Sequence, residues 1–228
     1  MSATAVMERA LQSGGESHDA IYRAAAHALR RVVTSRPHHA MTPRLLVDAG
    51  CGAGKFRDFA SHLADEYVGV DVVRHGRLRD DLRFLQADLD GHAIPLPDDC
   101  AAIVTAIEVI EHLDNPRAFC RELVRILALG GCLVVTTPNQ ASALSVLSLA
   151  VAGRFPAFQE ASYPMHRTAL LPVDLERIAT ECGLRQIEIH YSRRGRIPLT
   201  ALHYPALLSR ALPRALSDNV LMVGCKDG

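Results

Sequence analysis

The chain has 228 residues, of which 49% are hydrophobic, and this is enough to bury a substantial core as one domain over 1–228. Its 25 basic residues balance its 25 acidic residues, so the overall charge favours neither a nucleic-acid partner nor a membrane partner. No run of eighteen apolar residues is present, so we expect no transmembrane segment. Six cysteines without a C-x-x-C pair favour a reducing, cytoplasmic location over a disulfide framework or a structural zinc site.

Residues 1–43 are expected to form a helical lead-in. Residues 18–33 carry apolar side chains near one helical face, and Arg36-Pro37 is a stop signal. Such a helix could cover the mouth of a cofactor site and bring Tyr22 to the ligand. It could equally pack against the edge of a sheet, and the sequence leaves both alternatives open.

A glycine-rich turn follows the lead-in. A short apolar run at 44–47 predicts a buried strand, and the spacing over 56–64 predicts a helix. Gly50, Gly52 and Gly54 lie between them at every second position. Because glycine permits positive φ and lets a ligand approach bare backbone, the pattern predicts a ligand-binding turn.

The charges beside this turn favour a cationic ligand over a phosphate. Asp48 ends the strand, where its carboxylate would repel a phosphate and attract an ammonium or a sulfonium. The dinucleotide fingerprint requires a glycine at the sixth position of G-x-G-x-x-G, and this chain has Lys55 there. A nicotinamide-dependent oxidoreductase therefore fits the turn poorly.

Strands and helices alternate after the turn, which is typical of a parallel α/β sheet. The predicted strands at 67–71 and 82–88 end in Asp71 and Asp88, and a fourth strand is predicted at 100–106. Carboxyl ends of parallel strands meet at one sheet edge, where open α/β folds bind ligands. A carboxylate at Asp71 could accept hydrogen bonds from both hydroxyls of a ribose.

The run Val47-Asp48-Ala49-Gly50-Cys51-Gly52-Ala53-Gly54 resembles the first motif of class I S-adenosylmethionine (SAM)-dependent methyltransferases. The resemblance implies SAM as cofactor and a Rossmann-like α/β fold, with a seven-stranded, mostly parallel sheet and helices on both faces. It also implies that 219–225 forms the last strand, antiparallel between the fifth and sixth. In that family an acid at the position of Asp88 meets the adenine amine, and the next backbone amide meets a ring nitrogen. The expected cofactor-binding residues are Asp48, Ala49, Gly50, Cys51, Gly52, Gly54, Asp71, Val72, Asp88, Leu89, Ile107 and Glu108.

A second motif, E-x-x-E-H, follows the fourth strand as Glu108, Glu111 and His112. It resembles the ubiquinone-biosynthesis O-methyltransferases, in which these side chains are associated with a divalent metal. It is also similar to the small-RNA 3′-terminal 2′-O-methyltransferases, which add a second histidine, and His166 is the candidate here. After the motif, Asp114 or Asn115 is expected to cap a helix that has Pro116 at its first position.

Three interpretations of this motif stay open. His112, alone or with His166 and Glu111, could act as catalytic base toward a hydroxyl of a small-molecule, sugar or secondary-metabolite acceptor. Alternatively, Glu108, Glu111, His112 and His166 could hold a divalent metal, as in RNA 2′-O-methylation. The side chains could also have only a packing role. The RNA alternative would need stacking aromatics, but aromatic residues make up only 5% of the chain.

The second half of the chain carries weaker signals. Residues 129–132 are expected to close a helix with a glycine C-cap before a fifth strand at 133–137. A helix at 174–182 and a strand at 186–191 follow. The intervening segments 141–171 and 192–218 are expected to be insertions that contact substrate or form a lid.

These two insertions admit several roles. Residues 143–152 are almost wholly apolar and could cover the acceptor pocket or pack in the core. Arg193, Arg194 and Arg196 could bind an acidic acceptor or form a solvated turn. The apolar run at 199–216, broken by prolines, could be a helical lid, a homodimer surface or a shallow membrane-facing patch.

Overall fold

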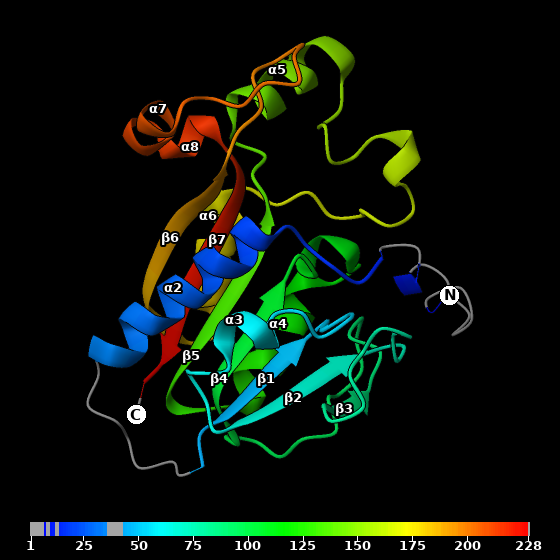
Figure 1. Ribbon diagram of the computed structural model, residues 1–228, viewed down its shortest axis with the longest axis vertical. Coiled ribbons are helices and arrows are strands. Elements are labelled where there is room, and N and C mark those ends of the chain that lie inside the picture. Colours follow the sequence, from blue (N-terminus) through cyan, green and yellow to red (C-terminus); the bar gives the residue numbers. More distant parts are fainter. Residues whose placement is uncertain (1–6, 8–9, 12–13, 36–42, 228) are drawn as a thin grey trace.

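A computed structural model describes residues 7, 10–11, 14–35 and 43–227. A seven-stranded sheet with the order β3-β2-β1-β4-β5-β7-β6 forms its centre (Figure 1). β1 to β5 are parallel to one another, and β7 runs antiparallel to both of its neighbours, β5 and β6. The predicted sheet and the predicted place of its last strand are therefore confirmed. The strands are β1 (Leu45–Ala49), β2 (Glu66–Asp71), β3 (Arg83–Gln86), β4 (Ala101–Ile107), β5 (Leu127–Pro138), β6 (Leu184–Arg194) and β7 (Ser217–Lys226).

Helices lie on both faces of this sheet, because neighbouring strand residues point to opposite sides. Leu46 packs in a buried cluster with residues of α2, whereas Val47 packs in another cluster with residues of α4 and α6. No helix in the described part of the chain is long and apolar enough to cross a membrane. The helices are α2 (Asp19–Ser35), α3 (Arg57–Ala60), α4 (Pro116–Ile126), α5 (Ala143–Ala152), α6 (Pro172–Glu181), α7 (Ala206–Ala211) and α8 (Pro213–Leu216), with short 3-10 turns η1 (Ile110–His112) and η2 (Glu160–Ser162).

The predicted start of α4 is confirmed, whereas other predicted helix ends are not. The side chain of Asn115 accepts a hydrogen bond from the backbone N–H of Ala118, so Asn115 is the N-cap of α4. The helix predicted at 56–64 is shorter, since α3 covers only Arg57–Ala60. The expected helix stop at Arg36-Pro37 lies outside the described residues.

The predicted glycine C-cap at 129–132 is wrong. α4 ends at Ile126, and β5 begins at once with Leu127. The glycines instead allow a close approach within the sheet, where the pairing of β4 with β5 shifts register. A Cβ on Gly131 would lie 2.8 Å from the carbonyl oxygen of Ala128 and 2.9 Å from that of Ala102.

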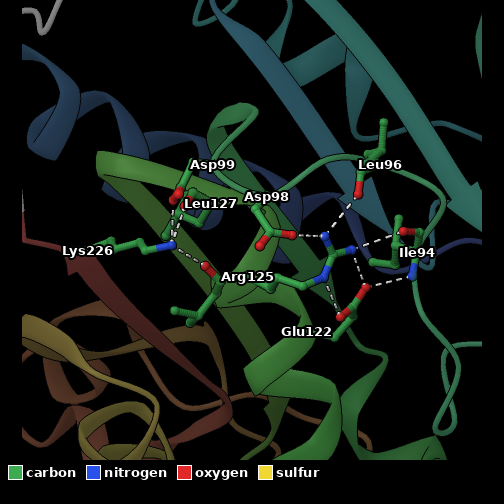
Figure 2. A network of polar contacts seen from close by, with 9 residues as sticks. Ile94, Leu96, Asp98, Asp99, Glu122, Arg125, Leu127 and Lys226 are labelled. Atoms are coloured by element: carbon green, nitrogen blue, oxygen red, sulfur yellow. Dashed lines mark hydrogen bonds and ion pairs between the residues drawn. The ribbon is translucent and has the colours of Figure 1, made fainter.

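Lys226 takes over the capping of α4, and Arg125 links the same end of the helix to the turn before β4. The side chain of Lys226 donates to the carbonyl oxygens of Val124 and Leu127 and pairs with Asp99 at 2.7 Å. The Arg125 guanidinium makes five hydrogen bonds, to the carbonyl oxygens of Ile94 and Leu96 and to Asp98 and Glu122 (Figure 2). This network ties the end of α4 to the turn before β4 and to the last strand.

A buried carboxylate joins the three central strands. Asp48, at 2% exposure near the end of β1, accepts hydrogen bonds from Tyr67 on β2 and Thr105 on β4. Burial raises the pKa of Asp48 from 3.8 to about 6, while the two hydroxyl donors oppose that shift. The pair of contacts ties β1 to both of its neighbours, directly before the glycine turn.

Replacing Arg125 with leucine should destabilise the protein by about 2 to 3 kcal/mol, because a buried part of its network would lose its donor. Arg121→Leu, on the exposed face of the same helix, is the matched control and should change stability by less than about 0.5 kcal/mol. Urea unfolding followed by circular dichroism measures both. Equal losses in the two variants would contradict the structural role of the network.

Asp48→Asn should flatten the dependence of stability on pH. Because the folded pKa is raised, the folded state binds a proton more tightly than the unfolded state, so wild-type stability falls as pH rises from about 4 to about 6. Asparagine has nearly the same shape as aspartate and cannot ionise. The difference in free energy of unfolding between the wild type and Asp48→Asn should therefore change by about 1 to 3 kcal/mol over that pH range. Urea unfolding across this range tests it, with the exposed Asp80→Asn as control. If the free energy of unfolding depended on pH in the same way in wild type and Asp48→Asn, the raised pKa of Asp48 would be refuted.

Candidate active site

A cavity of about 410 Å³ opens at the carboxyl ends of β1, β2 and β4. Its walls come from the lead-in, from the turns after the first four strands and from a short piece of the 141–171 insertion. The lining residues are Ala10, Gly15, Glu16, Ser17, His18, Ile21, Tyr22, Gly50, Gly52, Asp71, Val72, Asp88, Leu89, Asp90, Ile107, Glu108, Val109, Glu111, His112, Leu113, Met165 and His166.

The glycine turn forms one wall of this cavity. Gly50 and Gly52 line it and both have positive φ, at 77° and 50°. A Cβ on Gly52 would lie 2.2 Å from the carbonyl oxygen of Gly15, so the lead-in crosses directly over the turn. Gly54 is outside the lining, and its missing side chain makes room for Leu78 instead. The three glycines therefore have different roles.

The other predicted residues of the first motif lie beneath the cavity rather than in its wall. Asp48, Ala49 and Cys51 are all buried, with exposures of 5% or less. The carboxylate of Asp48 is directed into the sheet, toward Tyr67 and Thr105. Its role in this structure is to support the turn from below.

Asp71 lines the cavity and is held in a fixed orientation. One carboxylate oxygen accepts from the N–H of Gly52 at 2.9 Å, and the other accepts from the N–H of Val72 at 2.7 Å. Burial raises the pKa of Asp71, and these amide contacts oppose the shift. Asp88 and Leu89 also line the cavity, so the acids after β2 and β3 reach the same space as the glycine turn.

The lead-in covers the cavity more closely than the sequence indicated. Tyr22 lines the cavity, and its hydroxyl accepts a hydrogen bond from the N–H of Ser17 at 2.7 Å. Lys55 pairs with Asp19 at 2.8 Å and with Glu16 at 3.6 Å. The lysine that replaces the sixth-position glycine therefore fastens the lead-in over the turn. The sequence analysis missed Glu16, Ser17 and His18 as lining residues, since no local pattern marks them.

The two glutamates of the second motif are enclosed in different ways. The carboxylate of Glu108 accepts from Thr136 at 2.9 Å and from Asn219 at 2.6 Å. The carboxylate of Glu111 accepts from Thr137 at 3.1 Å. Burial raises the pKa of Glu108 to about 8, with Glu111 contributing, and burial raises that of Glu111 to about 7. The acids are therefore poised to hold protons near neutral pH.

The structure brings together His112 and His166, which lie far apart in the sequence. Their ring centroids are 4.9 Å apart. Nδ1 of His112 lies 2.9 Å from the carbonyl oxygen of Met165, and Nδ1 of His166 lies 2.5 Å from that of Ala157. Because a carbonyl only accepts, each Nδ1 carries a proton, and in the neutral form of either imidazole the lone pair is on Nε2. Burial and the neighbouring His112 lower the pKa of His166.

Arg167 fixes the position of the second histidine. Its guanidinium pairs with Asp90 at 3.0 Å and also with Asp114. Its backbone N–H donates to the carbonyl oxygen of Glu111 at 2.8 Å. The segment that carries His166 is therefore fastened to both the turn after β3 and the E-x-x-E-H motif. Sequence reasoning missed this residue, whose only signal was its place beside His166.

The predicted insertions contribute little to the cavity. Within 141–171 only Met165 and His166 line it, and no residue of 192–218 belongs to its wall. In the described part of the chain, α5, α7 and α8 therefore lie outside the lining.

Three of the four predicted metal-ligating residues fit a divalent ion. The ligand atoms of Glu111, His112 and His166 lie within 4.8 Å of one another. Both imidazoles donate through Nδ1 to backbone carbonyls, which is the usual outer arrangement of metal-binding histidines. Glu108 is not in this group, since its carboxylate faces Thr136 and Asn219.

The chain is similar to known proteins in sequence and in fold. A family model described as a methyltransferase domain matches residues 18–189. A probable SAM-dependent methyltransferase of Mycobacterium tuberculosis is 36% identical over 115 residues, which cover 48% of this chain and 41% of that protein. A mitochondrial ubiquinone biosynthesis O-methyltransferase of Dictyostelium discoideum is 28% identical over 127 residues, or 47% of this chain and 40% of that protein. The chain thus aligns with less than half the length of both relatives.

The fold is shared more widely than the sequence. A SAM-dependent methyltransferase structure from Archaeoglobus fulgidus superposes with a TM-score of 0.62, covering 90% of this chain and 94% of that one at 17% identity. The family match spans most of the chain, and the sheet order agrees with a class I methyltransferase fold. This chain therefore belongs to the methyltransferase domain family, with the fold of SAM-dependent methyltransferases.

Proposed function

We propose that this enzyme transfers the methyl group of SAM to a hydroxyl of a small-molecule, sugar or secondary-metabolite acceptor, with His112 as general base. The observation that carries the proposal is the His112 imidazole on the cavity wall, whose Nδ1 is held by the carbonyl of Met165. The ubiquinone O-methyltransferase similarity supports an oxygen acceptor. The scattered cysteines, with no C-x-x-C pair in the sequence, support a reducing, cytoplasmic setting.

The proposed cofactor site uses the wall formed by the strand ends. The carboxylate of Asp71 lies in the cavity wall and is oriented by backbone N–H groups, so its remaining lone-pair capacity can accept a hydrogen bond from a ribose. Asp88 and the N–H of Leu89 would recognise adenine, and Gly50 and Gly52 would face the methionine part. Asp48, Ala49, Cys51 and Gly54 would support this wall from behind.

The chemistry requires one proton acceptor. SAM, when bound, supplies an electrophilic methyl group on its sulfonium sulfur. When the methyl group passes from this sulfur to the acceptor oxygen, the hydroxyl would lose a proton, and Nε2 of His112 would take it up. The carbonyl of Met165 stabilises the resulting imidazolium through Nδ1–H. His166 and Glu111 lie beside this ring and would orient the acceptor.

A metal-dependent reaction is the second candidate, favoured by the close grouping of Glu111, His112 and His166. These residues would hold a divalent ion, which would supply Lewis-acid activation of the acceptor hydroxyl. A 3′-terminal RNA hydroxyl is one such acceptor. Glu108 would take part in this candidate only as a buried acid behind the ligands, bonded to Asn219.

Asp71→Asn should weaken SAM binding by about tenfold to a hundredfold, because the amide loses one acceptor and the negative charge. Titration calorimetry with SAM measures the effect, and NAD should give no heat. Asp58→Asn, an exposed change on α3, is the control and should bind SAM as the wild type does. Unchanged affinity in Asp71→Asn would contradict the proposed ribose contact.

His112→Ala should lower turnover about a hundredfold or more while SAM affinity changes less than about twofold. Transfer of labelled methyl groups to a panel of hydroxylated small molecules measures turnover, and calorimetry measures affinity. A fully active variant would remove His112 from the mechanism. If a chelator abolishes wild-type activity, a divalent ion restores it and His166→Ala loses bound metal, then the second candidate replaces the first.

A further inference from the structure

One end of the molecule exposes many large aliphatic side chains. We define the apolar end as residues 143–154 and 194–214, which include α5, α7 and the turn before α7. Leu199 is fully exposed, and Val151, Leu207 and Leu202 are 79%, 77% and 67% exposed. Further exposed members are Val146, Leu147, Leu149, Leu208 and Leu212.

These segments lie together beyond the carboxyl end of β5. Figure 1 shows α5, α7 and α8 at the same end of the long axis of the molecule. The side chain of Asn139 donates to the carbonyl oxygen of Arg214, and the hydroxyl of Ser145 donates to the carbonyl oxygen of Asn139. This chain of bonds connects the first turn of α5 to α8. None of the segments lines the active-site cavity.

The backbone of Leu199 has a conformation that leucine rarely adopts, at a fully exposed position. Its φ is +64°, in the left-handed region where glycine or asparagine is less strained than leucine. It occupies the tip of a turn in which the N–H of Ile197 donates to the carbonyl oxygen of Leu202. A bulky apolar side chain is therefore presented to the outside at a position better suited to glycine.

The charges at this end have one sign. Segments 143–154 and 194–214 together contain five arginines and no aspartate or glutamate, although the whole chain is neutral. Arg194, Arg210 and Arg214 are exposed, and none of them forms an ion pair with the described residues. Arg196 and Arg154 pair with Asp218 and Glu160, which lie outside the apolar end.

We propose that the apolar end docks on the surface of an anionic lipid bilayer. Peripheral proteins bind such membranes by inserting apolar side chains and by electrostatic attraction to anionic headgroups. The exposed leucines can provide the first interaction, and the arginines beside them can provide the second. The leucines at 199, 202, 207 and 208 enter the interface, and the arginines contact lipid phosphates. The docking is independent of the acceptor chemistry proposed above.

Two other occupants fit this surface less well. A second copy joined through the same patch would place arginines against arginines, since a twofold contact pairs like surfaces. Single-stranded RNA is bound through stacking aromatic side chains, and the apolar end contains one aromatic residue, Tyr204. An anionic bilayer matches both the arginines and the exposed aliphatic side chains of the apolar end.

Vesicle co-sedimentation of the full chain tests the proposal, with phosphatidylcholine vesicles that contain or lack about 30% phosphatidylglycerol. Wild type should bind only the anionic vesicles, and high salt should weaken binding. Arg210→Gln with Arg214→Gln should weaken it about 25-fold, at about fivefold for each arginine. Leu199→Ser with Leu207→Ser should weaken it at least about tenfold.

Matched controls lie away from the apolar end. Arg30→Gln with Arg31→Gln, exposed on α2, and Leu129→Ser, 56% exposed near the start of β5, should bind vesicles as the wild type does. SAM calorimetry confirms that each variant is folded. No binding of wild type to anionic vesicles, or equal losses in controls and test variants, would overturn the proposal. It would also be overturned if light scattering showed a dimer that the leucine variants dissociate, or if the chain bound single-stranded RNA but not vesicles.

Discussion

The contact between the Asp48 carboxylate and the hydroxyls of Tyr67 and Thr105 holds the rest of the site in place. It joins β1 to both of its neighbours, β2 and β4, and the turns after these three strands all contribute to the cavity wall. Burying the charged form of Asp48 costs free energy, and for this reason its pKa is raised to about 6. The hydrogen bonds from the two hydroxyls reduce this cost. The N–H of Gly52 reaches Asp71, and the acid and the glycine turn face one cavity.

The antiparallel β7 shapes the opposite wall. Its pairing with β5 places Pro138 opposite Asn219, so an amide from the last strand meets the carboxylate of Glu108. Thr136 and Thr137 on β5 supply the remaining donors to the two glutamates. A long connection from β5 then returns His166 to His112. The proposed chemistry therefore depends on contacts between segments that are distant along the chain.

The two insertions, which were expected to contact substrate or form a lid, lie partly at the cavity and partly at the apolar end. The first insertion contributes Met165 and His166 to the cavity wall, while α5 belongs to the apolar end. The second insertion contributes only to the apolar end. Asn139, after the end of β5, bonds to both Ser145 and Arg214 and so connects the two segments of the apolar end. Attachment to a bilayer through the apolar end would leave the residues of the cavity wall outside the contact.

Local patterns in the sequence predicted most of the strands and the acids at their ends, whereas the antiparallel place of the last strand was expected from the family resemblance. Apolar runs, acids at strand ends and alternating glycines act within a few residues, so they predicted the strands and the place of Asp71 and Asp88. Only the tertiary structure decided that Lys55 fastens the lead-in, that Gly131 serves strand approach rather than helix capping, and that Asn219 encloses Glu108. It also decided that α5 is exposed rather than buried. These outcomes depend on which distant segments meet, and local periodicity carries no information about a partner tens of residues away.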